Sequence, residues 1–304
     1  MAAEAVRISG MSTASRGTGS SGLAGPIRLG LIGDNIKSSR SPDLHRFAGR
    51  LCGLDVTYDL FVPRDMAKDF DAVFNACRDD GIHGVNVTYP YKEAVVSRLR
   101  IDDELTRRIG SVNTVVFGPD GALGYNTDHT GFIAAYRATF GGQPPGNVVV
   151  IGAGGVGKAV AFGLLALGAE ALTIIDSDAG KARSLAVAIA AVSGRSVKTT
   201  SGDDIRLVMD GAEGLVNCTP LGMIGYPGSP VPPELLGPQR WAFDAVYTPV
   251  DTMFKLQAEA AGLKVLSGYE LFFRQGIDAF CIFTGRMPAN LGALRRMLLE
   301  TSPN

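Results

Sequence analysis

A lysine and an aspartate in this chain have the residue types and settings that proton transfer needs. Lys92 closes the stretch GVNVTYPYK at 84–92, in which a short apolar strand is expected to end at Pro90. A lysine at this point is poorly placed for solvent and requires a carboxylate partner. Asp128, in the turn Gly-Tyr-Asn-Thr-Asp at 124–128, is the candidate. A desolvated lysine–aspartate pair can hold, orient and deprotonate an alcohol, so we expect Lys92 and Asp128 to be catalytic.

A glycine-rich turn further along the chain predicts a dinucleotide site. Gly152-Ala-Gly-Gly-Val-Gly157 stands between an apolar strand at 147–151 and a helix expected over Gly157–Leu167. In this setting Gly152 permits the tight turn, Gly154 lets the backbone approach a pyrophosphate, and Gly157 allows close packing of helix and strand. The phosphates then lie at the helix N-terminus, where free N–H groups point outward. The cofactor-binding residues expected in this turn are Gly152, Gly154, Gly155, Val156 and Gly157. Proton transfer beside a hydride acceptor indicates a dehydrogenase.

The residues after the next strand predict that the cofactor is NAD rather than NADP. Asp176 follows the strand Leu172–Ile175, where an acid that binds the ribose should stand. A carboxylate accepts hydrogen bonds from a ribose 2′-OH but repels a 2′-phosphate. The following Ser177 and Asp178 bring no arginine to offset that repulsion. We therefore expect Asp176 and Ser177 to bind NAD; the alternative is that Asp176 only caps the helix after it.

Candidate substrate-binding groups lie nearer the N-terminus. Ser39-Arg-Ser41-Pro42 precedes a helix start and offers two hydroxyls and free backbone donors, which suit a carboxylate. Ser111-Val-Asn113-Thr lies between Lys92 and Asp128, and its amide can bind a hydroxyl. We expect Ser39, Ser41 and Asn113 to contact the substrate.

The composition is that of an ordinary globular enzyme. Its 304 residues exceed what one core usually serves, and 46% are hydrophobic and 19% charged, which leaves enough apolar side chains for two domains. A formal net charge of −1 without blocks of like charge favours neither nucleic acid nor a membrane as partner. The four cysteines are scattered, which predicts buried thiols in a reducing, cytoplasmic setting and no metal site. Met1 to Gly25 is rich in small and polar residues and is interpreted as a disordered extension.

The predicted elements alternate between strand and helix, so we expect an α/β fold of two domains with mainly parallel sheets. A first series of strands begins at 27–32, 56–62 and 85–88, with helices from Pro42 and over Arg64–Arg78. A second series begins at 147–151, with strands at 172–175, 214–217, 241–246 and 264–266 and helices at 179–192 and 252–261. The tail after Gly268 is helical in pattern and is expected to return to the first domain. This places the substrate domain at 26–127 and 268–304, and a Rossmann domain at 128–267.

These motifs together resemble the shikimate dehydrogenase family, in particular its NAD-dependent quinate/shikimate dehydrogenase branch. The family carries Ser-x-Ser-Pro, Asn-Val-Thr-x-Pro-x-Lys, Val-Asn-Thr and Gly-Tyr-Asn-Thr-Asp segments, which stand here at 39–42, 86–92, 112–114 and 124–128. The segments 217–223, 244–249 and 268–275 are each similar to a further family motif. The likeness runs from about Ile27 to about Pro288, so it covers nearly the whole chain.

The resemblance implies a role for each matching residue. The substrate carboxylate would be held by Ser39, Ser41 and Tyr247, and ring hydroxyls by Thr88, Asn113 and Gln275. Lys92 and Asp128 would act at the C3 hydroxyl, whose reversible oxidation to a ketone passes a hydride to nicotinamide. Thr219, Val246 and Gly268, which belong to the later motifs, are expected to line the cofactor. The implied partners are a small-molecule substrate and NAD, and the family includes monomers and homodimers.

Departures from the family pattern leave the substrate open. Typical NADP-dependent members carry Asn-Arg-Thr after the second Rossmann strand, where this chain has Asp176-Ser177-Asp178. That segment resembles the NAD branch, as do Tyr89 and Tyr91. Ser38 replaces a usual histidine, and Glu270 replaces a small residue expected near the nicotinamide end. Shikimate, quinate or an amino-substituted analogue therefore remain alternatives. A catalytically silent ligand sensor on the same scaffold should have lost Lys92, Asp128 or the glycine loop, and all three are intact. His129, which borders Asp128, is expected in the first turn of a helix rather than on substrate.

Overall fold

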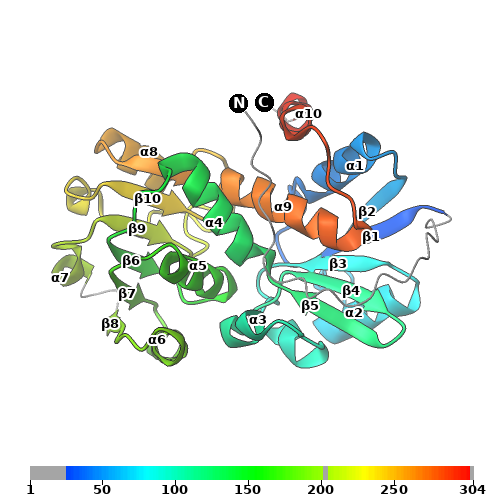
Figure 1. The fold of residues 1–304 in the computed structure, drawn as a ribbon, viewed down its shortest axis with the longest axis horizontal. Coiled ribbons are helices and arrows are strands. Elements are labelled where there is room, and N and C mark those ends of the chain that lie inside the picture. The colour runs from blue at the N-terminus through cyan, green and yellow to red at the C-terminus, as the bar shows by residue number, and fades with distance from the viewer. Residues whose placement is uncertain (1–24, 201–204, 302–304) are drawn as a thin grey trace.

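The computed structural model describes residues 25–200 and 205–301 and contains two sheets. The expected disordered extension lies outside the described residues except for Gly25. Five strands form the first sheet in the order β2-β1-β3-β4-β5, and six form the second in the order β11-β10-β9-β6-β7-β8. Figure 1 shows the two sheets side by side with helices α4 and α9 crossing between them. The fold is the predicted two-lobed α/β arrangement, and below we call these the first and second lobe.

The first sheet combines parallel and antiparallel strands. Strands β1 (Ile27–Ile32), β2 (Val56–Phe61) and β3 (Gly84–Val87) are parallel, as predicted from their alternation with helices. The hairpin of β4 (Thr114–Gly118) and β5 (Gly121–Tyr125) adds two antiparallel strands that we did not expect. Its turn at residues 119–120 leads into Gly121, whose positive φ of 107° glycine tolerates best. This hairpin carries the chain from β3 to the Asp128 turn.

The helices of the first lobe are α1 (Ser41–Leu51), α2 (Phe70–Asp79), the short 3₁₀ helix η1 (Ala94–Arg98) and α3 (Glu104–Ile109). The prediction of a helix over Arg64–Arg78 was wrong at its start. The side chain of Asp69 accepts a hydrogen bond from the Ala72 N–H, so it caps α2 and the residues before it form a turn. Ala67 has a positive φ of 52°, which no α-helix can include.

The second sheet is parallel throughout, which matches the predicted Rossmann arrangement. Its strands are β6 (Asn147–Ile151), β7 (Ala171–Ile175), β8 (Lys198–Thr200), β9 (Gly214–Asn217), β10 (Trp241–Asp244) and β11 (Lys264–Ser267). Between them lie α5 (Gly155–Ala166), α6 (Ala179–Ser193), α7 (Ile205–Met209), the 3₁₀ helix η3 (Pro233–Leu235) and α8 (Met253–Ala260). The inner strands β6, β7, β9 and β10 are mostly apolar because helices cover both faces, whereas the edge strand β8 is polar and largely exposed.

Two helices connect the lobes. Helix α4 (Thr127–Phe140) leaves the first sheet and buries Phe132 and Tyr136 in the core of the second lobe. Helix α9 (Gly268–Thr284) leaves the second sheet and buries Phe280 and Phe283 in the core of the first. The last helix, α10 (Leu291–Glu300), also packs on the first lobe, so the helical tail returns as predicted.

The two connecting helices lie against each other closely. A Cβ placed on Gly131 of α4 would lie 2.8 Å from the backbone nitrogen of Gln275 on α9, so only glycine allows this approach. The boundaries predicted near residues 127 and 268 fall at the starts of these helices and stay predictions.

Candidate active site

The predicted catalytic pair meets in the structure. The Lys92 ammonium donates to Asp128 Oδ2 over 2.6 Å, and their side chains are only 15% and 5% exposed. Lys92 follows β3, and Asp128 is the second residue of α4. The N-cap of α4 is Asn126, whose side chain accepts from the His129 N–H, so Asp128 does not serve as the cap. Its carboxylate therefore remains for Lys92.

Both side chains line a cleft of about 1120 Å³ between the carboxyl ends of the two sheets. Such an edge is where parallel α/β sheets bind their ligands. All but one of the predicted site residues line this cleft: Lys92, Asp128, Ser39, Ser41, Thr88, Asn113, Tyr247, Gln275, Gly152, Gly154, Gly155, Val156, Asp176, Ser177, Thr219, Val246 and Gly268. The exception, Gly157, is buried behind the turn. Residues far apart in the chain thus reach one cavity.

An amide network adjoins the catalytic pair. Asn113 Nδ2 donates to Thr127 Oγ1 over 2.9 Å and to Gln275 Oε1 over 3.2 Å, while Asn113 Oδ1 accepts from the Thr127 N–H. Asn86 donates through Nδ2 to the Asn113 carbonyl over 3.1 Å, and its Oδ1 accepts from the Tyr58 hydroxyl over 2.9 Å. These bonds fix the orientation of the amides that line the cleft. Sequence reasoning missed Asn86 and Tyr58 as supports, although an asparagine in an apolar strand is a signal of such a network.

The serine pair lies at the start of α1, on the first-lobe side of the cleft. The Ser39 hydroxyl lies 3.2 Å from the Ser41 hydroxyl, and Arg40 is the N-cap residue of the helix. Burial raises the pKa of Tyr247, and a hydrogen bond with Ser39 acts in the opposite direction. The two serines and the Tyr247 phenol therefore form one group of donors, which fits an anionic substrate group.

The glycine turn has the shape required for a dinucleotide. Gly152 has a φ of 101°, and a Cβ there would lie 2.7 Å from the Cys218 backbone. A Cβ on Gly157 would lie 1.9 Å from the Gly152 carbonyl oxygen, so helix and strand pack as predicted. A Cβ on Gly154 would meet nothing within 4 Å, which leaves open space where a pyrophosphate approaches.

Asp176 lies beside this turn and accepts two backbone hydrogen bonds. Its Oδ2 accepts from the Ala153 N–H over 2.7 Å, and its Oδ1 from the Asp178 N–H over 2.8 Å. The cap of α6 is Asp178, whose side chain accepts from the N–H groups of Gly180 and Lys181. Asp176 thus does not cap the helix; it ties the turn to the end of β7 and presents negative charge to the cleft.

Comparison with known proteins agrees with this geometry. Residues 31–115 match the shikimate dehydrogenase substrate-binding domain. A quinate/shikimate dehydrogenase (NAD(+)) of Corynebacterium efficiens is 39% identical over 86% of this chain and 94% of its own length. The chain belongs to the shikimate dehydrogenase family.

Further relatives differ in their cofactor. The NADP(+) shikimate dehydrogenase of Streptomyces avermitilis is 40% identical over 88% of this chain and 93% of its own length. Among solved structures, the quinate dehydrogenase of Corynebacterium glutamicum in complex with NAD has a TM-score of 0.81 and 34% identity, covering 91% of this chain and 100% of that one. The Thermus thermophilus shikimate 5-dehydrogenase in complex with NADP(H) and shikimate has a TM-score of 0.75 and 32% identity, covering 90% and 99%.

Of the two residues that depart from the family pattern, Ser38 lines the cleft, whereas Glu270 does not, and neither does His129. Glu270 forms a bidentate ion pair with Arg295 of α10, at 2.5 and 2.9 Å, and does not line the cavity. The Glu270 carboxylate binds Arg295 instead of facing the cleft, so its expected place near the nicotinamide is not supported. His129 is buried in the first turn of α4 and also lies outside the cleft lining, as expected. Burial lowers its pKa.

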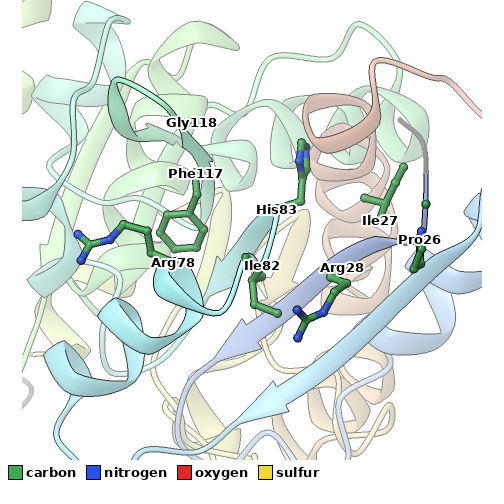
Figure 2. Close-up of a pocket in the computed structure, with 10 residues that line it drawn as sticks. Pro26, Ile27, Arg28, Arg78, Ile82, His83, Phe117 and Gly118 are labelled. Atoms are coloured by element: carbon green, nitrogen blue, oxygen red, sulfur yellow. The ribbon is translucent and has the colours of Figure 1, made fainter. Parts of the chain in front are cut away.

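A second hollow of about 400 Å³ lies at the start of β1 and holds none of the predicted site residues (Figure 2). Figure 2 shows the guanidinium groups of Arg28 and Arg78 lying apart rather than meeting at one centre. Arg28 donates to the Asp80 carbonyl, Arg78 pairs with Asp79, and His83 contacts the Phe283 carbonyl. Because these three side chains already have protein partners, they do not converge on a common point in the hollow.

Within residues 25–200 and 205–301, no group of three or more histidine, cysteine or acidic side chains is arranged to hold a metal ion. In the same part of the chain, no helix is long and apolar enough to cross a lipid bilayer.

Asp244, at the end of β10, gives this family member a pH-sensitive element. Its carboxylate accepts from the side chains of Asn217 and Thr252 and from the Val246 N–H. Burial raises the pKa of Asp244 to about 6, against the opposing effect of these hydrogen bonds. The folded protein thus holds the Asp244 proton more tightly than the unfolded chain does. The stability that protonated Asp244 contributes is therefore fully present below about pH 4 and is lost as the pH rises through about 6.

We expect the Asp244 contribution to the free energy of unfolding to fall by about 1 kcal/mol between pH 5 and pH 7. Urea unfolding of the wild type and of Asp244→Asn at both pH values measures it. The wild type should lose more stability than the variant over this interval. Equal losses in the two proteins would show that Asp244 does not titrate in this range.

Proposed function

We propose that this protein is an NAD-dependent dehydrogenase that reversibly oxidises the C3 hydroxyl of shikimate, quinate or both to the corresponding ketone. The observation that carries the proposal is the buried Lys92–Asp128 ion pair in the cleft that the glycine turn also lines. An alcohol bound beside this pair has both a proton acceptor and a neighbouring dinucleotide site.

The other cleft residues suit a polyhydroxylated carboxylate. The donors Ser39 and Ser41 at the start of α1, together with Tyr247 after β10, would hold the carboxylate, because charge-assisted hydrogen bonds are the strongest available there. In the same cleft, Thr88, Asn113 and Gln275 present hydroxyl and amide groups that would bind ring hydroxyls. Substrate held at both ends has little freedom to rotate, which brings C3 to Lys92.

The chemistry divides between protein and cofactor. Bound NAD supplies the hydride acceptor for the C3 hydrogen. Lys92 polarises the C3 oxygen, the hydroxyl proton passes to the Lys92–Asp128 pair, and Asp128 orients the lysine throughout. The glycine turn and the N-terminus of α5 would hold the pyrophosphate, together with the cleft-lining Thr219, Val246 and Gly268 for the remainder of the cofactor.

Asp176 supports NAD as the preferred cofactor. Its carboxylate lies at the end of β7 beside the glycine turn. There it would accept a hydrogen bond from a ribose hydroxyl and would repel a 2′-phosphate. Ser177 beside it adds a hydroxyl and no positive charge.

Initial rates of cofactor reduction with shikimate and with quinate, each against NAD and NADP, test the proposal. We expect reduction with at least one substrate and a higher kcat/KM with NAD. A clear preference for NADP would refute the role of Asp176 alone. No reduction with either substrate would refute the dehydrogenase proposal for these compounds.

A further inference from the structure

The residue after the catalytic lysine forms an ion pair with the other lobe. Lys158, in the first turn of α5, donates to Glu93 Oε2, and the two side chains are 18% and 35% exposed. Glu93 precedes η1 in the first lobe, whereas α5 begins at the glycine turn of the second lobe. The pair therefore joins the catalytic segment directly to the helix that would hold the cofactor phosphates.

A second contact lies immediately beside this ion pair. A Cβ on Gly155, the first residue of α5, would lie 2.8 Å from Lys92 Cβ and 2.8 Å from Ser111 Oγ. The backbone of the glycine turn thus rests on the stem of Lys92. The Lys92 carbonyl also accepts from the Val112 N–H over 2.9 Å. Ammonium, stem and carbonyl of this lysine are each in contact with a different segment.

This arrangement bears on the alignment of the reacting groups. Hydride transfer requires the C3 atom, which the first lobe would hold, to face a nicotinamide that the second lobe would hold. The separation of Lys92 from the glycine turn determines that alignment. An ion pair adjacent to both, and about three quarters withdrawn from solvent, restrains the separation more than an exposed pair would.

We propose that Glu93 and Lys158 are positioning residues that hold the glycine turn in register with Lys92. Glu93 lines the cleft, but its carboxylate bonds to Lys158 rather than to Lys92, and the pair acts through the placement of Lys92 and α5. The inference rests on the proposed dehydrogenase function. It predicts that loss of the pair slows turnover while leaving the affinity for each ligand nearly unchanged.

A double-mutant cycle of Glu93→Gln, Lys158→Met and the double variant tests the pair. We expect each single variant to lower kcat about ten-fold, with KM values for NAD and substrate within about three-fold of wild type, since displacement of well-aligned groups costs rate rather than binding. The double variant should lose no more than either single variant, because both changes remove one interaction. Lys158→Arg, which keeps the charge, should retain most of the activity.

Glu104→Gln is the matched control, because Glu104 forms an ion pair with Arg108 inside α3 of the same lobe and lies outside the cleft lining. Its kcat should equal that of the wild type. Thermal unfolding of each variant separates lost turnover from lost folding, and the more conservative Glu93→Gln provides the result if Lys158→Met does not fold.

Three results would overturn the inference, and they differ from failure of the proposed function. Wild-type kcat in both single variants would show that the pair does not position anything. A rise in the KM for NAD confined to Lys158→Met would mean that Lys158 binds the cofactor itself. Additive losses in the double variant would mean that the two residues act separately. An inactive wild type, by contrast, would refute the proposed function.

Discussion

Lys92→Ala should lower kcat at least ~100-fold, the low end for removal of a positioned proton-transfer group. The ammonium donates to the Asp128 carboxylate over 2.6 Å, and truncation removes both the polarising charge and the proton path. Initial rates at saturating substrate and NAD measure the effect. Near-normal turnover would contradict the assignment of Lys92.

Two companion measurements make the Lys92 result specific. Asp128→Asn should also lower kcat strongly, because the amide no longer holds the ammonium by charge. NAD binding to Lys92→Ala, followed by calorimetry, should remain close to wild type, since the glycine turn is intact. Loss of NAD binding together with turnover would indicate a general disturbance of the cleft instead.

Alanine at two glycines of the turn should have opposite consequences. Gly157→Ala places a methyl group 1.9 Å from the Gly152 carbonyl oxygen, so the turn must move, at a cost of about 1–3 kcal/mol in stability. Gly154→Ala meets nothing within 4 Å, so stability should stay unchanged. Its methyl group stands where the pyrophosphate approaches, and NAD affinity should fall about ten-fold or more, because a displaced pyrophosphate loses its bonds to the helix N-terminus.

Thermal unfolding and NAD titration of both variants check this contrast. Gly142→Ala serves as control: a Cβ there also meets nothing within 4 Å, but the residue lies in the loop after α4 and outside the cleft lining. It should leave both the melting temperature and NAD affinity as in the wild type. Full NAD affinity in Gly154→Ala would place the phosphates elsewhere.

Much of the site was predictable because its residues belong to local motifs. In the turn from Gly152 to Gly157, glycine stands where a Cβ would clash with the backbone or would fill the space that a pyrophosphate approaches. The glycine spacing therefore predicts the conformation of the turn. Strand and helix alternation predicted the parallel order, and carboxyl ends of parallel strands share one edge. Lys92 and Asp176, which follow different strands, are found in a common cleft, and Thr219, which the family resemblance alone implied, lies there too.

Other features depended on partners, some local and some distant, that the residue pattern did not reveal. The antiparallel hairpin of β4 and β5, the true start of α2 at Phe70 and the turn of Glu270 toward Arg295 were not predicted. Helix α2 begins at Phe70 because the Asp69 side chain caps it by accepting from the Ala72 N–H. Glu270 turns outward because α10 places the Arg295 guanidinium beside it. The local pattern of polar and apolar residues does not show which of several possible partners will form the hydrogen bond or ion pair.

Sequence by itself determined which groups this protein brings to its cleft, because residue type and strand order are properties of the chain. Tertiary structure alone decided how they meet: that Asn126 caps α4 and leaves the Asp128 carboxylate to Lys92, and that Lys158 reaches Glu93 across the lobes. The physical reason is that hydrogen bonds and ion pairs act over about 3 Å. Distances of that size between segments are set by packing of the α4 and α9 helices, not by spacing along the chain.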